Sequence, residues 1–213
     1  MRLYLSSFAM GNQPQELVSL SRGGARPAVI VNAADLKDPM GREASVRLQV
    51  DTLGALGFDA EEMDLRRYFG RSRALSRAIS RFDLVWVRGG NLFLLRRAFR
   101  LSGFDEVLEH LLGEDAVAYG GYSAGACVLS PSLRGMELVD DPAQVPEGYE
   151  AGTVWDGLGL LPYMIAPHYK SEHPESPRID ELVRYFIDNH MLFRALRDGE
   201  AIVVDGDRES VVS

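Results

Sequence analysis

The amino-acid sequence predicts an α/β fold organised around a mostly parallel sheet. Short apolar runs of strand length alternate along the chain with longer segments in which apolar residues recur at helical spacing. A glycine-rich turn between one such strand and the following helix carries a serine, Ser123. The chain has 213 residues, of which 46% are hydrophobic, and this size and composition suit one large domain with a packed core. We therefore expect residues 1–213 to form one domain.

The predicted elements follow one another as strand and helix through most of the chain. The expected strands are the short apolar runs 3–7, 27–31, 58–63, 84–87, 116–119, 163–166 and 201–204. The expected helices are the periodic segments 41–56, 71–80, 92–100, 104–112, 124–129 and 178–190. The run 84–87 predicts a buried strand that leads directly into the permissive loop Arg88-Gly89-Gly90-Asn91. Proline, glycine and acidic residues between 140 and 159 predict a long loop of the kind that often contacts substrate.

The composition argues against nucleic-acid and membrane partners. The formal net charge is −8, and acidic residues flank the densest arginine cluster, 66–81, which predicts a solvated helical face. The single cysteine, Cys127, suits a reducing compartment and is expected in the core. The first residues lack the features of a signal peptide, and no segment approaches the roughly 20 apolar residues of a membrane span. We expect a soluble, cytoplasmic protein.

The stretch Gly121-Tyr122-Ser123-Ala124-Gly125 has the composition and the setting of a nucleophile elbow. A strand-like run precedes it, and a helix-like run follows it. Small neighbours permit the tight turn that exposes a serine at the tip of a strand, and amide groups at the helix start would face a developing oxyanion. The alternative is a glycine-rich turn with an incidental serine. Motif and context together favour a catalytic Ser123.

Four histidines are available as the base for this serine. His168 follows an apolar, strand-like run, which places it at the sheet edge where the elbow should emerge. His173 lies in a polar loop and is the alternative base or a substrate-pocket residue. His110 is better explained as a surface residue of a helix, and an interaction with the end of the helix 178–190 accounts for His190 equally well.

The third catalytic candidate is Asp198, which precedes the predicted strand 201–204. A carboxylate there could hold the imidazole of the base in the required tautomer. The pair Asp198-Gly199 is also a hairpin-turn signal. The order serine, histidine, acid differs from the α/β-hydrolase order of serine, acid, histidine. Three further acidic residues keep that second order open: Asp140, Asp141 and Asp156.

With its motifs in this order, the chain resembles the dipeptidase E (aspartyl dipeptidase) family of serine peptidases. The resemblance covers most of the chain and rests on Gly89-Gly90-Asn91, Gly121-Tyr122-Ser123-Ala124-Gly125-Ala126, Pro167-His168 and Leu196-Arg197-Asp198-Gly199. It implies a flavodoxin-like, class I glutamine amidotransferase-like fold, with helices on both faces of the sheet and serine in place of the amidotransferase cysteine. It also implies that Ser123 is the nucleophile, that His168 is the general base, and that Gly89 or Gly90 forms the oxyanion hole together with Ala124.

Two departures from the family pattern bear on the predicted site. Asp198 stands where the familiar aspartyl dipeptidases carry glutamate. Residues 172–177 contain no arginine, although the resemblance places there an arginine that pairs with the aspartate side chain of the substrate. We therefore expect no strict selectivity for amino-terminal aspartate, and Glu175 could favour a cationic group such as a peptide amino terminus. The expected substrate-binding residues are Asn91, His173, Glu175 and Arg178.

The predicted activity is that of a metal-independent serine peptidase that cleaves short peptides through an acyl-enzyme. Cysteine and histidine spacing does not suggest a zinc site, and the loop 88–91 lacks the fingerprint of a phosphate loop, so no cofactor is expected. Alternatives on the same machinery are an esterase, an amidase or a cyanophycin-type peptidase. An alternative of another class is a non-catalytic binding protein with the amidotransferase-like fold. Short peptides are the expected partners, and a homodimer is left open.

Overall fold

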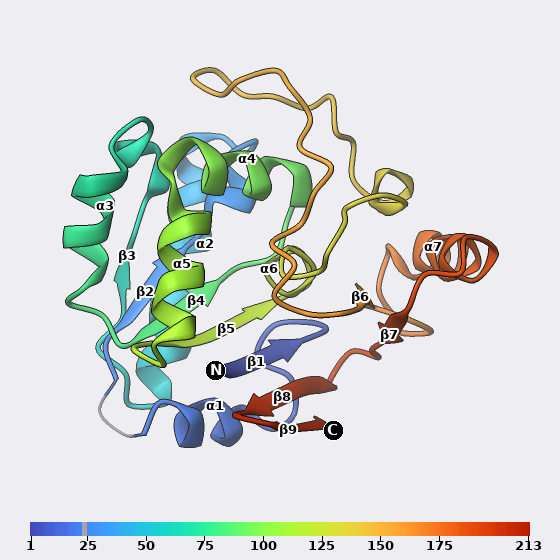
Figure 1. The fold of residues 1–213 in the computed structure, drawn as a ribbon, viewed down its shortest axis with the longest axis horizontal. Helices are drawn as coiled ribbons and strands as arrows, with labels where there is room; N and C mark the ends of the chain where they lie inside the picture. The colour runs from blue at the N-terminus through green and yellow to red at the C-terminus, as the bar shows by residue number, and fades with distance from the viewer. Residues whose placement is uncertain (23–24) are drawn as a thin grey trace.

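The computed structural model describes residues 1–22 and 25–213 and is centred on a seven-stranded sheet (Figure 1). Its strands, in spatial order, are β3 (Glu61–Glu62), β2 (Pro27–Ile30), β4 (Leu84–Val87), β5 (Ala118–Tyr122), β1 (Arg2–Ser6), β8 (Ala201–Asp205) and β9 (Arg208–Val212). Strands β1 to β5 are parallel, whereas β8 and β9 are antiparallel additions at one edge. Two further strands, β6 (Met164–Ala166) and β7 (Phe193–Ala195), form a separate parallel pair.

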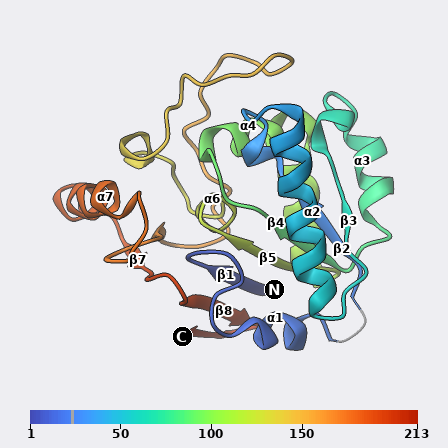
Figure 2. The same ribbon diagram turned by 180° about the vertical axis from the view of Figure 1, so that it is seen from behind.

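Helices cover both faces of the central sheet. One face carries α1 (Pro14–Leu20) and α2 (Pro39–Ala55), and the other carries α3 (Ser72–Ile79), α4 (Leu92–Ser102) and α5 (Phe104–Gly113) (Figures 1 and 2). The short helix α6 (Ala124–Cys127) follows β5, and α7 (Ser176–Asp188) packs beside β6. Three 3₁₀ helices lie at Asn32–Ala34, Leu65–Tyr68 and Met136–Leu138. The predicted fold class is confirmed.

The core consists of two apolar layers separated by the sheet. Successive side chains of β1 point to opposite faces, so Leu3 and Leu5 pack in one layer while Tyr4 packs in the other. All five residues of β1 are buried, which is typical of a parallel strand that helices cover on both sides. The central strands are therefore covered by helices on both faces, and the loops that follow them emerge at the ends of the sheet.

Most predicted elements are present within a few residues of their expected ends, but two differ. The run 58–63 forms strand only at Glu61–Glu62, because β3 is the sheet edge and pairs with β2 alone. The run 163–166 gives β6, which pairs with β7 outside the central sheet, so its expected place in that sheet was wrong. Helix α1 and strands β7 and β9 were not predicted, since their few apolar residues give little periodicity.

Residues 140–159 form the predicted long excursion and are fixed to the fold by polar contacts. The Arg97 guanidinium donates to the carbonyl oxygens of Pro142 and Gly152, and the Tyr149 hydroxyl donates to the carboxylate of Asp35. Within residues 1–22 and 25–213, no helix is long and apolar enough to cross a bilayer. Cys127 is buried, as expected, and burial raises the pKa of its thiol.

Candidate active site

The candidate site lies where the carboxyl ends of three parallel strands meet. Ser6 pairs with Tyr122 across β1 and β5, and Val87 pairs with Gly121 across β4 and β5. The residues that follow these strands therefore emerge side by side at one edge of the sheet, which is the usual position of a site in such folds. Strand β8 runs the other way, so its amino-terminal end, at Ala201, reaches the same edge opposite Ser6.

Ser123 occupies a strained turn between β5 and α6. Its φ is 50° and its ψ is −118°, a conformation that costs a non-glycine residue free energy and that clusters at active sites. A Cβ at Gly125 would lie 2.2 Å from the Val87 carbonyl oxygen, so only glycine allows this helix to pack so close to β4. Ser123 is half-buried in this turn, between the strand and the helix that the sequence predicts on either side of it.

The glycine loop after β4 lies directly beside the elbow. A Cβ at Gly89 would come within 2.9 Å of Ser123 Cβ, and Gly90 has a φ of 142°, where a side chain would also meet the Ala33 carbonyl. In residues 1–22 and 25–213, Gly90 N donates no hydrogen bond, whereas the amide of Asn91 donates to Ala33 O. Free amides next to a nucleophile have the chemistry of an oxyanion hole.

His168 and Asp198 form a hydrogen-bonded pair at this edge. His168 Nδ1 lies 2.7 Å from Asp198 Oδ1, and His168 is almost fully buried. The carboxylate fixes the tautomer in which Nδ1 carries the proton and Nε2 has a free lone pair. Ser7 connects the two residues, because its hydroxyl accepts from His168 N and donates to Asp198 Oδ1, both at 2.8 Å.

The pairing of β6 with β7 explains how two distant segments reach this contact. After the two strands end, the ladder continues as Leu196 N donates to Ala166 O and Tyr169 N donates to Leu196 O. His168 and Asp198 are therefore held in register by the backbone, and the chain continues from Asp198 into β8. The sequence placed His168 correctly at a strand end, although that strand belongs to the small sheet.

The surroundings of His168 keep its imidazole neutral. Burial lowers the pKa of His168 below its ordinary value, and the nearby His173 ring lowers it further, against the opposing effect of Asp198. The rings of His168 and His173 are stacked, with centroids 3.7 Å apart and an angle of 9° between their planes. Phe8 packs edge-on against both rings. A neutral, oriented imidazole can accept a proton at neutral pH.

Ser123 and His168 line the same cavity of about 160 Å³, together with Phe8, Arg88, Gly89, Gly90, Tyr122, His173 and Glu175. No hydrogen bond joins the Ser123 hydroxyl to His168 within the described parts of the chain. Catalytic hydrogen bonds are often long before substrate binds. The fold therefore brings together the predicted nucleophile, base and acid, which follow one another along the chain as Ser123, His168 and Asp198.

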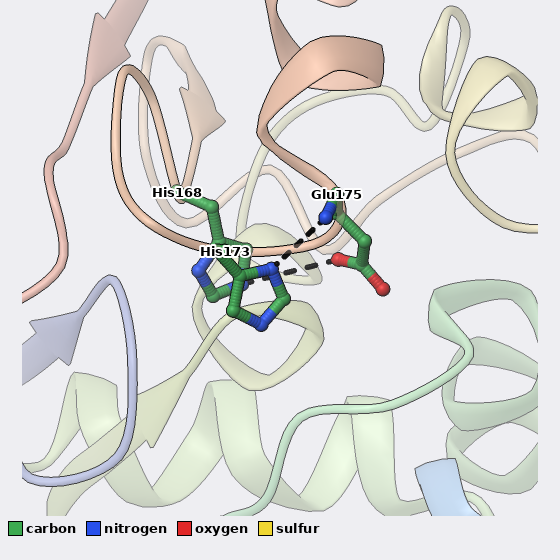
Figure 3. Close-up of side chains that lie close together, drawn as sticks. All are labelled: His168, His173 and Glu175. Atoms are coloured by element: carbon green, nitrogen blue, oxygen red, sulfur yellow. Dashed lines mark hydrogen bonds and ion pairs between the residues drawn. The ribbon is translucent and has the colours of Figure 1, made fainter.

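Glu175 and the two stacked histidines form a compact polar group (Figure 3). Glu175 Oε2 lies 4.0 Å from His168 Nε2, and Glu175 N donates to His173 Nδ1. In the described parts of the chain this is the one group of three or more such side chains close enough to surround a metal ion. A metal lies in the plane of each imidazole that binds it, and two parallel rings stacked face to face cannot both meet that condition. The stack therefore does not favour a metal centre.

The remaining predicted residues lie around this cavity. The Asn91 side chain caps α4 by accepting from Leu94 N and also donates to Asp141 O. Asn91, Glu175 and Arg178 line a neighbouring cavity of about 410 Å³. His110 and His190 are exposed, as expected, and line neither cavity.

Of the alternative acids, Asp140 has a structural contact that the sequence did not predict. Its carboxylate accepts from Leu92 N at the start of α4, and burial raises its pKa to about 7. The hydrogen bond joins the long excursion to the helix that follows the glycine loop. Asp140 is therefore placed to anchor the excursion 140–159 to α4, whereas Asp198 contacts His168.

Three residues of this site were not singled out by sequence reasoning: Ser7, Phe8 and Arg88. Ser7 and Phe8 come directly after β1, and Arg88 comes directly after β4. Their position at the carboxyl ends of predicted strands was the available signal, because those ends converge on the elbow. Their side-chain contacts depend on segments far away in the sequence.

The fold defines the class of this protein, an α/β protein with a mostly parallel central sheet and with Ser123 in a tight turn at the carboxyl end of β5. The chain belongs to peptidase family S51, whose model matches residues 20–212. It is 34% identical over 131 residues to Peptidase E of Streptomyces coelicolor, which covers 59% of this chain and 50% of that protein. It is 32% identical over 180 residues to a probable alpha-aspartyl dipeptidase of Drosophila melanogaster, covering 81% of this chain and 67% of that protein. The matched region thus spans about half the length of the Streptomyces relative.

Two solved structures share the fold. A putative peptidase E protein from Listeria monocytogenes EGD-e superposes with a TM-score of 0.79 at 21% identity, covering 99% of this chain and 97% of that one. A peptidase from an acI-B1 actinobacterium superposes with a TM-score of 0.72 at 16% identity, covering 100% of this chain and 87% of that one. At these identities the likeness establishes the common architecture.

Proposed function

We propose that this protein is a serine peptidase that hydrolyses short peptides through an acyl-enzyme. The observation that carries the proposal is the strained Ser123 turn beside a buried His168 whose Nδ1 lies 2.7 Å from Asp198. Membership of peptidase family S51 supports the same reaction class. The proposed triad is Ser123, His168 and Asp198.

In the proposed mechanism, Ser123 Oγ attacks the scissile carbonyl carbon while His168 Nε2 takes the hydroxyl proton. The imidazolium then gives that proton to the leaving amine, and the carbon–nitrogen bond breaks to leave an ester on Ser123. A water attacks the ester with His168 again as base, which releases the acid and restores the serine. Asp198 holds the ring and stabilises its charged form throughout.

The negative charge that develops on the carbonyl oxygen would be stabilised by backbone amides. The proposed donors are the amide of Ala124, which follows Ser123, and that of Gly89 or Gly90. Within residues 1–22 and 25–213, Gly90 N makes no other hydrogen bond, which supports this role. A single such donor contributes about 2.7–4 kcal/mol to transition-state stabilisation in other hydrolases.

The proposed substrates are short because the catalytic cavity is small and bounded by side chains on several sides. The Glu175 carboxylate lies close to His168 and could bind the amino group of a peptide. The His173 ring stacks on the His168 ring. Residues 172–177 supply no arginine for an aspartate side chain. We therefore propose cleavage of short peptides without strict selectivity for amino-terminal aspartate. The proposed location is the cytoplasm, which the single buried thiol supports.

A library of dipeptides and tripeptides incubated with the purified protein tests the proposal. We expect release of free amino acids from a subset of the library and none with Ser123→Ala, measured beside a thermal melt of each protein. Hydrolysis that survives in folded Ser123→Ala protein would contradict the serine mechanism. A fully folded wild-type protein that cleaves no member of the library would contradict the peptidase assignment.

A further inference from the structure

Arg88 is a cation without an anionic partner in the wall of the catalytic cavity. It follows β4 directly, precedes Gly89 and lines both the catalytic cavity and its larger neighbour. Its Nη1 donates to Gly89 O, whereas its Nε is buried without any hydrogen-bond partner. Within residues 1–22 and 25–213, its guanidinium makes no ion pair. No carboxylate of these residues therefore neutralises the charge of Arg88.

Two buried arginines, Arg42 and Arg96, make ion pairs that Arg88 lacks. Within residues 1–22 and 25–213, buried Arg97 also makes no ion pair, but it donates to the carbonyl oxygens of Pro142 and Gly152 and does not line the cavity that contains Ser123. The guanidinium of Arg42 contacts the carboxylates of Asp35 and Glu62, and that of Arg96 contacts Asp105. A buried N–H without an acceptor costs free energy, so such groups are normally paired. An unpaired guanidinium that faces a cavity beside a nucleophile has the chemistry expected for recognition of an anionic ligand group. Its planar donor array matches a carboxylate through two parallel hydrogen bonds.

The cavity wall also carries the opposite charge. Glu175 lines the same two cavities as Arg88, and no ion pair joins the two side chains. A small cavity with one cation and one anion that do not neutralise each other is complementary to a zwitterion. A short peptide is such a molecule, since its termini carry an ammonium and a carboxylate at neutral pH.

We propose that Arg88 is a specificity-determining residue that binds a carboxylate of the peptide while Glu175 faces the peptide ammonium. The proposal rests on the proposed peptidase function and adds to it the charge pattern of the substrate. The carboxylate has two sources, the carboxyl terminus of a dipeptide or an acidic side chain. Both would bind Arg88 through the same paired hydrogen bonds.

Carboxylate binding by Arg88 has to be distinguished from a simpler role, in which Arg88 only orients the backbone beside it. Because its Nη1 donates to Gly89 O, it could only orient the peptide group between Gly89 and Gly90. Loss of a positioning residue would reduce turnover of every substrate by the same factor. Loss of a carboxylate-binding residue would affect only ligands that carry the carboxylate.

The test measures binding by calorimetry to Ser123→Ala protein, with and without Arg88→Gln. Ala-Leu against Ala-Leu amide reports the carboxyl terminus, and Asp-Leu amide against Asn-Leu amide reports an acidic side chain. We expect one pair to differ by about ten- to a hundredfold in Kd, the usual range for a hydrogen bond to a charged group. Arg88→Gln should abolish that difference, and Arg88→Lys should retain part of it. Lys37→Gln, which removes a cation from the neighbouring cavity, should leave the difference unchanged.

Several outcomes would overturn the carboxylate role of Arg88. The first is equal Kd values within both ligand pairs. The second is a difference in Kd that survives Arg88→Gln in protein with an unchanged melting temperature. The third is no binding of any ligand at millimolar concentration. Hydrolysis of the same peptides by protein with Ser123 intact separates the two proposals. Arg88-dependent binding without hydrolysis would leave the carboxylate site standing and contradict the peptidase function. Hydrolysis that Arg88→Gln reduces equally for all peptides would contradict the carboxylate site alone.

Discussion

Replacing Asp198 with asparagine removes the acceptor that orients the candidate base while preserving side-chain size. Asp198 Oδ1 accepts from His168 Nδ1 at 2.7 Å and from the Ser7 hydroxyl at 2.8 Å. An asparagine can instead turn its NH₂ group toward Nδ1, which moves the imidazole proton to Nε2. Nε2 would then have no lone pair with which to take the Ser123 proton. The protein should remain folded because Asp198 is partly exposed and the Ser7 hydroxyl, which would then face the NH₂ group, can accept a hydrogen bond from it.

The expected loss in kcat is about 10³- to 10⁴-fold, the size seen when a triad acid of another serine protease can no longer select the tautomer. This corresponds to about 4–5.5 kcal/mol of activation free energy. The assay is dipeptide hydrolysis followed by free-amine detection, with a thermal melt of each variant. Asp156→Asn is a matched control, since Asp156 was an alternative acid but does not contact His168, and its activity should stay within about threefold of wild type. A loss below tenfold in folded Asp198→Asn protein would refute the assignment of the acid.

The remaining predictions concern the nucleophile, the base, the specificity and the pH response. His168→Ala should reduce turnover about as severely as Ser123→Ala, since the two residues act as one unit. His173→Ala should reduce turnover less. If His173 is required for turnover and His168 is not, the assignment of the base is wrong. Specificity constants for Asp-Leu, Ala-Leu and Lys-Leu should differ by less than a hundredfold, and a larger preference for Asp-Leu would show that a cation outside 172–177 binds the aspartate side chain. The pKa of His168 is lowered, so kcat/KM should fall only when the pH drops below about 6.5, the usual pKa of histidine. If the acidic limb of the pH–rate profile has its midpoint above that value, the base is not a buried neutral histidine. Burial raises the pKa of Asp140 in the folded protein to about 7, so ionisation of this carboxyl group opposes folding increasingly from about pH 4 up to pH 7. Asp140→Asn should therefore raise the melting temperature more at pH 8 than at pH 5. An equal change at both pH values would contradict this effect of Asp140 on stability.

The parts of the fold that sequence reasoning predicted well are those with strong local patterns. The bounds of β4 were predicted to the residue, because an apolar run ends there at Arg88 and the glycine loop. The Ser123 turn was predicted because its small neighbours permit only a tight bend between strand and helix. In both cases the pattern that carries the prediction lies within a few consecutive residues, although the close packing of Gly125 on Val87 depends on the fold.

The parts that were missed depend on contacts between distant segments. The pairing of β6 with β7 outside the central sheet brings His168 to Asp198. Strand β6 was predicted, but β7 has too few residues for a clear pattern, so the pairing was missed. The role of Ser7 arises only because β1 ends beside the elbow and its hydroxyl reaches both partners of the pair. The charge of Arg88 is evident in the sequence, but its lack of a partner is a property of the fold.

Labelling with a fluorophosphonate probe tests the central claim most directly, because the probe reacts only with an activated serine. Mass spectrometry of the digested protein should locate one adduct, on the peptide that contains Ser123. The labelling rate should fall at least a hundredfold in folded His168→Ala protein, since the probe needs the same base as the substrate. Labelling at another serine, or labelling of Ser123 at an unchanged rate without His168, would contradict the proposed catalytic site.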